Sequence, residues 1–214
     1  MSLVVRTLSD RLVELVRDRI LSGDVPADRP IRQDALAGEL GVSKIPLREA
    51  LGRLEQEGLL RSRANRGWFV PPMTLAEMEE VYSLRLRLEP DALAEGGRAA
   101  GAEDHRFAAE ALDRLEQAVA AHGPAVGALN RAFHLALVRP AARPLTASIL
   151  ERLHILSERY VRMHLEPLGR DARANDEHRR MLEAWRSGDG EGLAALARVH
   201  TERTLADLRR ELAA

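Results

Sequence analysis

The chain has 214 residues and a formal net charge of -1, with 45% hydrophobic but only 3% aromatic residues. This length suits one or two domains, and a core of this composition must be built mainly from Leu, Ala and Val. The absence of cysteine excludes disulfides, thiolate zinc sites and cysteine nucleophiles. Because no apolar run approaches the ~20 residues that span a bilayer and no secretory signal is apparent, we expect a cytoplasmic protein with no membrane partner.

The amino-terminal residues have the spacing of an amphipathic helix. Apolar side chains recur every three or four positions over residues 8–20, and Thr7 or Ser9 is placed to cap the helix. Gly and Pro cluster in residues 23–30 and predict a break. A short second helix is expected at about residues 34–40.

The next thirty residues predict a helix followed by a hairpin. Gly41 turns the chain into a third helix, which Ser43 is placed to cap and which ends near Gly58. Residues 59–63 and 68–70 have the composition of two short strands. A turn, a helix and a hairpin in this order predict a winged helix-turn-helix DNA-binding domain over residues 1–72.

A helix-turn-helix places the first residues of its second helix at base edges and phosphates in the major groove. Over residues 43–72 six basic side chains stand against three acidic ones, a local excess that suits phosphate contact. Arg48 can form a bidentate contact with guanine, and the wing tip can approach the minor groove. The expected DNA-binding residues are Ser43, Lys44, Ile45, Arg48, Arg66 and Gly67.

Helical patterns continue from residue 73 to the end. Thr74 and Glu77 are spaced as a capping box, and no convincing strand follows. We therefore predict a mostly α protein whose residues 73–214 form an all-α antiparallel bundle of about six helices. The expected breaks between these helices lie at residues 96–101, 122–124, 139–144, 167–171 and 187–190.

Histidines in the bundle are spaced so that they can meet. Asn130 and His134 are four residues apart on one predicted helix and share a face. His178 lies 11 residues before Asp189 and His200 lies 11 residues after it. If the two helices fold back at that turn, both imidazoles lie roughly 16 Å from it at the same height. Imidazole suits zinc, nickel and related ions, although hydrogen-bonded core histidines would give the same pattern.

The segment PLREALGRLEQEGLL, followed by RGWFV, resembles the signature of the GntR family of bacterial transcription regulators. The helical remainder resembles the FCD ligand-binding domain of the FadR-type branch. Its matching residues are Tyr82, Arg85, Leu88 and Glu89, then the segments 130–134, 177–178 and 187–189, and finally His200.

This resemblance implies roles for several side chains. DNA contacts would fall on Ser43, Lys44, Ile45, Arg48 and Gly67. Ile45 stands where a hydroxyl residue is common in the family, which removes one phosphate contact.

The resemblance also implies a divalent metal ion, zinc, nickel or similar, in the bundle. Its ligands would be Asn130, His134, His178 and His200. An octahedral ion held by four protein ligands would leave two positions for a carboxylate effector. An arginine could clamp the far end of that small organic acid, with Arg85 as the first candidate and Arg152 and Arg159 as further ones.

One winged helix reads few base pairs, so we expect a homodimer on a palindromic double-stranded operator. Effector binding would then shift the bundle between two arrangements and change operator affinity. Two alternatives remain at this stage. One is an architectural DNA-binding dimer with no ligand, and the other is a metal-dependent hydrolase that uses the histidines to activate water.

Overall fold

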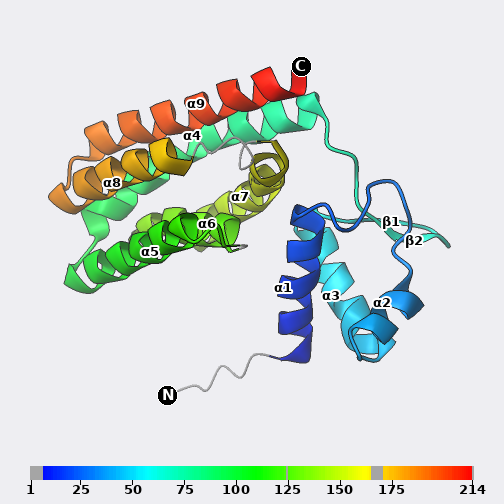
Figure 1. The fold of residues 1–214 in the computed structure, drawn as a ribbon. Coiled ribbons are helices and arrows are strands. Elements are labelled where there is room, and N and C mark those ends of the chain that lie inside the picture. Colours follow the sequence, from blue (N-terminus) through cyan, green and yellow to red (C-terminus); the bar gives the residue numbers. More distant parts are fainter. Residues whose placement is uncertain (1–6, 124, 165–170, 214) are drawn as a thin grey trace. The chain divides into compact units, whose positions relative to one another are not determined.

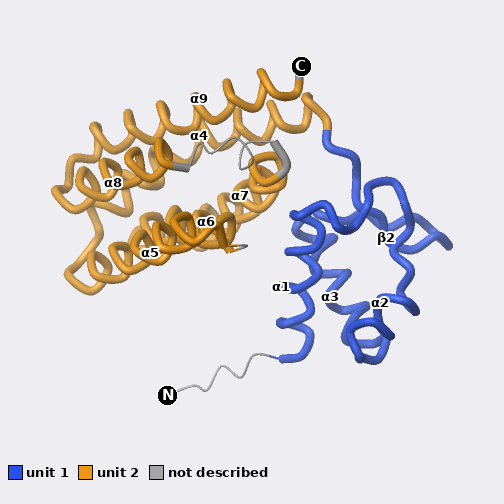
Figure 2. Tube along the Cα trace, in the orientation of Figure 1, with its two compact units in different colours: residues 1–73 blue, residues 74–214 orange. Residues whose placement is uncertain are grey.

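The computed structural model describes residues 7–123, 125–164 and 171–213. The chain divides into two compact units, residues 1–73 and residues 74–214 (Figure 2). Nine α-helices and one two-stranded antiparallel sheet occur in the described part (Figure 1). The prediction of a mostly α protein with a small hairpin after the helix-turn-helix region is confirmed.

Three helices form most of the first unit: α1 (Leu8–Leu21), α2 (Gln33–Glu39) and α3 (Lys44–Gln56). Helix α1 packs along α3, and the apolar stripes of both helices are turned inward. The buried side chains between them include Val16, Ile20, Leu47, Leu51 and Leu54.

The helix starts follow the capping pattern only in part. Thr7 is the N-cap of α1, and its hydroxyl accepts from the backbone of Asp10, whose carboxylate accepts from the Thr7 backbone. Ser43 is the N-cap of α3, as expected, but its side chain makes no capping hydrogen bond. The Ser43 hydroxyl is therefore not committed to its own helix.

The wing consists of β1 (Arg61–Arg63) and β2 (Gly67–Phe69), which pair antiparallel with Ser62 opposite Trp68. The first strand is shorter than predicted, and the second has the predicted length but begins one residue earlier. Gly67 was expected at the tip but begins the return strand, with a φ of +79° that favours glycine. The tip itself is residues 64–66, where Asn65 also has positive φ.

The described part of the second unit contains six α-helices, in agreement with the predicted number (Figure 1). They are α4 (Leu75–Ala99), α5 (Ala102–Ala120), α6 (Val126–Val138), α7 (Pro144–His164), α8 (Asp171–Ser187) and α9 (Gly190–Ala213), with a 3-10 turn at Arg139–Ala141 between α6 and α7. Helix α4 packs along α9, and α5 packs along α6. Leu, Ala, Phe133 and Trp185 side chains form the core, and the Trp185 indole donates to the Leu137 carbonyl at 3.0 Å.

The expected break at residues 96–101 is wrong in its first half. Helix α4 runs through Gly96 and ends at Ala99. A Cβ at Gly96 would lie 2.0 Å from the Leu137 carbonyl oxygen, so this glycine permits a close helix approach instead of ending the helix. The predicted break at 167–171 falls mostly outside the described residues.

Thr74 caps α4 through a hydrogen bond from the Glu77 backbone at 3.1 Å. The predicted capping box also required the Glu77 carboxylate to accept from the Thr74 backbone. Here that carboxylate accepts from the Tyr160 hydroxyl at 2.9 Å instead. This contact ties the first turn of α4 to α7. None of the helices within the described ranges is both long enough and apolar enough to cross a membrane.

Candidate functional sites: a recognition helix and a histidine cavity

The first turn of α3 presents the predicted DNA-contacting side chains to solvent. Ser43, Lys44, Ile45 and Arg48 are all exposed, while Leu47 between them is buried. Lys44 forms an ion pair with Asp34 of α2. Arg48 has no ion-pair or hydrogen-bond partner among the described residues, so its guanidinium is available to an external anion or base edge.

The wing tip offers a second cationic side chain. Arg66 is exposed and, within the described part of the chain, has no partner for its guanidinium. Gly67 lies directly after it at the start of β2. Arg63 on β1 is engaged differently, with its guanidinium 4.6 Å from the centre of the Phe69 ring and 3.9 Å from Asp28.

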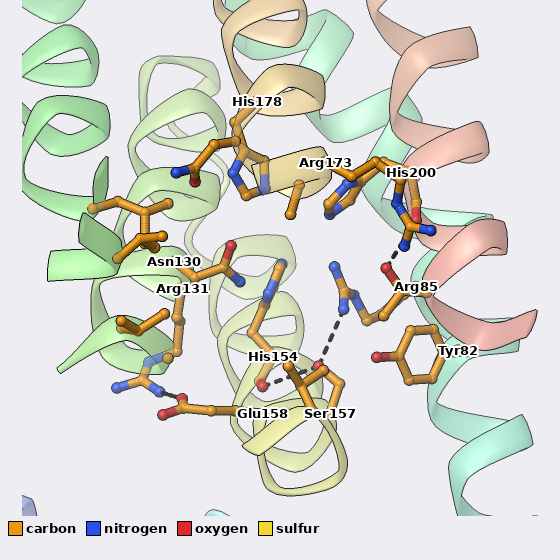
Figure 3. A pocket seen from close by; sticks show the side chains of 18 residues that line it. Tyr82, Arg85, Asn130, Arg131, His154, Ser157, Glu158, Arg173, His178 and His200 are labelled. Carbon is orange, nitrogen blue, oxygen red and sulfur yellow. Dashed lines mark hydrogen bonds and ion pairs between the residues drawn. The ribbon is translucent and has the colours of Figure 1, made fainter. Parts of the chain in front are cut away.

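A cavity of about 90 Å³ lies inside the helical unit, lined by side chains from α4, α5, α6, α7, α8 and α9 (Figure 3). One part of its wall is polar and contains Asn130, His154, His178 and His200. Another part is aliphatic. Its apolar side chains are Leu115, Val119, Val126 and Val161.

Three of the predicted metal ligands come together, two of them (His178 and His200) at the polar wall. His134, His178 and His200 each offer a ring nitrogen, and these atoms all lie within 4.8 Å of one another. His134 Nε2 and His178 Nε2 are 3.3 Å apart. Two nitrogens bound to one ion at about 2.1 Å would have about this separation, and so would a hydrogen bond between two imidazoles.

Asn130 lines the same cavity, one helical turn before His134 on α6. Figure 3 shows its carboxamide turned inward between the side chains of His178 and His154. The amide oxygen is a neutral ligand that a divalent ion can accept, although a carboxylate would bind such an ion more strongly. Asn130, His178 and His200 thus line the cavity, and His134 contacts His178 from behind that lining.

The environment keeps His134 and His178 in the form that binds metal. Burial lowers the pKa of His134, and burial together with the neighbouring His200 and His134 lowers the pKa of His178 well below its usual value. A neutral imidazole has a free lone pair for an ion. His178 Nδ1 is buried and has no hydrogen-bond partner among the described protein atoms, so the donor set fits a divalent ion.

Two carboxylates contact the histidines, a role that the sequence did not predict for them. Glu89 is 1% exposed, and its Oε1 lies 2.8 Å from His134 Nδ1 and 2.9 Å from His154 Nε2. The His134 contact has an ion-pair distance but is not aligned as a hydrogen bond. Glu177 Oε2 lies 2.7 Å from His200 Nδ1. Such carboxylates orient imidazoles and leave the opposite nitrogen for a metal.

Glu89 is also the counter-ion of Arg85. Arg85 Nε donates to Glu89 Oε2 at 2.9 Å, and Arg85 Nη1 donates to Ser157 at 3.1 Å. Burial opposes ionisation of Glu89, but Arg85, His154 and His134 outweigh that cost and hold the pKa of its carboxyl well below the ordinary value. The four-residue spacing of Arg85 and Glu89 on one helix was the available signal for this pair.

Tyr82 stands beside Arg85 on the cavity wall (Figure 3). Its side chain is fully buried, and burial raises the pKa of its hydroxyl to about 12. Although Arg85 and Ser157 lie next to it, the hydroxyl has no hydrogen bond of good geometry among the described protein atoms. A buried hydroxyl in this state is a ready partner for a polar group in the cavity.

Arg152 and Arg159 were expected near the effector and do not line the cavity. The cavity face of α7 carries His154, Ser157 and Glu158, and the helical phase turns residues 152 and 159 elsewhere. Arg152 is exposed and Arg159 is buried away from the cavity. The cationic side chains that do line it, besides Arg85, are Arg131, which pairs with Glu158, and Arg173, which pairs with Asp207.

Comparison with known proteins follows the same division of the chain. The family model described as bacterial regulatory proteins, gntR family, matches residues 8–70, and the model of the FCD domain matches residues 80–203. The chain is 28% identical to an uncharacterized HTH-type transcriptional regulator, BphR, of Paraburkholderia xenovorans, over 96% of this chain and 86% of that protein. It is 29% identical to a probable D-xylose utilization operon transcriptional repressor of Paenarthrobacter nicotinovorans, over 91% of this chain and 85% of the relative.

Solved structures show the same fold. The Escherichia coli protein McbR/YncC superposes with a TM-score of 0.82 at 23% identity, covering 97% of this chain and 100% of that one. A GntR regulator from Rhodococcus sp. RHA1 superposes with a TM-score of 0.78, also at 23% identity, covering 94% and 97%. The family and these relatives are transcriptional regulators and not enzymes, so the hydrolase alternative is set aside. With an exposed recognition helix in one unit and a buried histidine cavity in the other, this chain belongs to the GntR family of DNA-binding transcription regulators and carries an FCD domain.

Proposed function

We propose that this regulator binds a palindromic operator as a homodimer in the cytoplasm, and that a small organic acid in the metal-containing cavity controls this binding. The observation that carries the proposal is the cluster of three buried histidines, His134, His178 and His200, of which the last two line the cavity. The exposed first turn of α3 in the same chain supplies the response. A pure dimerisation domain has no need for buried, partly unpartnered polar groups around a cavity.

Asn130, His134, His178 and His200 would hold the divalent ion. When bound, the ion supplies a positive centre to which a carboxylate can coordinate. The chain has no carboxylate in the proposed ligand set, so the three imidazoles and the amide leave the charge of the ion unneutralised. This arrangement favours an anionic effector over a neutral one.

The remaining walls limit the size and shape of the effector. A cavity volume of about 90 Å³ suits a small organic acid and not a drug-sized ligand. The Tyr82 hydroxyl, which has no hydrogen bond of good geometry among the described protein atoms, and the Arg85 guanidinium beside it can contact a second polar group of the ligand. Val119, Val126 and Val161 would pack against its hydrocarbon part.

Control of DNA binding requires that the effector bind two arrangements of the dimer with different affinity. The cavity lining comes from six helices, α4 to α9, so a ligand that draws these walls together would change the packing of the bundle. Helix α4 begins at Leu75, directly after the first unit ends at residue 73. It is therefore the element through which such a change would reach the recognition helices.

Metal content tests the first part of the proposal. Protein purified without a histidine tag should contain about one divalent ion per chain, and His178→Ala should lose it. His122→Asn is the matched control, because His122 is exposed and has a positive φ that asparagine tolerates. A wild-type protein with no metal and no affinity for added zinc or nickel would refute the metal site.

Effector control needs a separate measurement. Small organic acids should raise the melting temperature of the metal-loaded protein by mass action and change its affinity for an operator found by random-oligonucleotide selection. If a broad set of acids changed neither quantity while the dimer still bound its operator, the architectural alternative would stand instead.

A further inference from the structure

The largest exposed aliphatic side chain on the recognition helix is unexplained by the fold. Ile45 is 72% exposed, whereas the other large apolar side chains of α3, Leu47, Leu51 and Leu54, are fully buried. An isoleucine in this state adds nothing to the core of the first unit, and its β-branched side chain is a weaker helix former than most. Intramolecular packing therefore gives no reason for it.

The side chains around Ile45 define what it faces. Lys44 is paired with Asp34, and Glu49 accepts a hydrogen bond from Ser9 at 2.7 Å, which holds its carboxylate toward α1. Arg48, one turn after Ile45, has no partner among the described residues. Ile45 and Arg48 thus lie three residues apart on one face of α3, the first outside the core and the second without a partner among the described residues.

The chemistry of the major groove offers one partner for an aliphatic side chain. Phosphate oxygens and the donor and acceptor edges of the bases need hydrogen bonds, which Ile45 cannot form. The thymine C5-methyl is the apolar group that the four bases present there. An isoleucine placed over it removes both apolar groups from water.

We propose that Ile45 is a specificity residue that reads the methyl group of a thymine in each operator half-site. The thymine lies within one or two base pairs of a guanine contacted by Arg48, since these residues are about 4.5 Å apart along the helix axis. The inference rests on the proposed operator reading by α3. It adds the identity of one base and the atom by which that base is recognised.

Uracil-substituted operators test this directly, because uracil differs from thymine only by the methyl group. The operator is first obtained by random-oligonucleotide selection with the full-length wild-type protein. Each thymine is then replaced singly by deoxyuridine, and the dissociation constant is measured. At one thymine per half-site the replacement should weaken wild-type binding about fourfold, which corresponds to roughly 0.8 kcal/mol for one buried methyl group.

Two variants separate a methyl contact from a general loss of affinity. Ile45→Ala should bind the thymine and uracil operators equally, and its melting temperature should match that of the wild type because Ile45 is exposed. Leu15→Ala is the matched control, since Leu15 is an exposed aliphatic residue of α1 in the same unit. It should keep the fourfold preference for thymine.

The outcomes distinguish a failure of the methyl contact from a failure of the proposed operator recognition. If the wild type selects an operator but every uracil replacement leaves its affinity unchanged, Ile45 does not read a methyl group, and operator recognition still stands. The same conclusion follows if Ile45→Ala keeps the preference for thymine. If the wild type shows no sequence preference at moderate salt, both the inference and the proposed function fall.

Discussion

Glu89→Gln is expected to destabilise the helical unit strongly. Glu89 is 1% exposed and forms an ion pair with Arg85, which is 5% exposed. Removing one member of a buried pair costs about 3–5 kcal/mol, because the other charge stays buried without compensation. Glutamine keeps an oxygen that can accept from Arg85 and His154, so we expect a loss near the lower end, about 3 kcal/mol.

Urea unfolding followed by tryptophan fluorescence measures this loss. The buried Trp185 reports on the helical unit alone if Trp68 of the wing is replaced by phenylalanine in every variant. With a urea dependence of about 2 kcal/mol per molar, the midpoint should fall by roughly 1.5 M. A chelator is included so that bound metal does not add to stability.

Two further variants make the reasoning refutable. Glu95→Gln removes a carboxylate that pairs with Arg143 at the surface, where solvent screens the charges, and its midpoint should match that of the wild type. Adding Arg85→Met to Glu89→Gln removes the uncompensated charge and should restore more than half of the lost stability. Equal midpoints for Glu89→Gln and Glu95→Gln would show that the buried pair does not stabilise the bundle as argued.

Three other changes have defined outcomes. Asn130→Asp should tighten zinc binding at least tenfold, because it replaces a neutral amide by a carboxylate. A competition titration with a chromogenic chelator measures this affinity, and an unchanged value would exclude residue 130 as a ligand. Gly96→Ala should lower the unfolding free energy by about 1–3 kcal/mol or more, since its Cβ would meet the Leu137 carbonyl oxygen at 2.0 Å. In the same thermal unfolding assay, Gly38→Ala should raise the unfolding free energy by about 0.5 kcal/mol, because a Cβ at Gly38 would have nothing within 4 Å. Thr74→Ala should cost about 1 kcal/mol by removing the cap of α4, and Thr74→Ser should restore it; identical melting temperatures for the two variants would show that the hydroxyl contributes nothing.

Local signals in the sequence were sufficient for most of the fold. Thr7, Ser43 and Thr74 each occupy the N-cap position of a helix, as the pattern of polar and apolar residues indicated. These signals depend on residues three or four positions apart, which the chain brings together in any helix. Local signals failed at Gly96, which permits a close helix approach instead of ending α4. This role depends on the carbonyl oxygen of Leu137, a residue 41 positions later.

The residues around the candidate cavity were likewise predictable only in part. The spacing of Asn130 and His134, and of His178 and His200 about their turn, predicted shared faces, and the structure brings the three imidazoles together. Helical phase then removed Arg152 and Arg159 from the lining. No spacing argument assigned Glu89 to His154, since these residues are 65 positions apart and meet only when α4 packs against α7.

The sequence by itself determined which segments are helices, where the hairpin lies and which residues face inward, because capping, turn formation and helical periodicity act over a few residues. Only the tertiary structure decided that Glu89 holds Arg85, His134 and His154 together and that the Tyr82 hydroxyl is left without a hydrogen bond of good geometry. Contacts of this kind depend on the rotation and depth at which packed helices meet. That geometry follows from the side chains of the whole core acting together, and no short stretch of the chain encodes it.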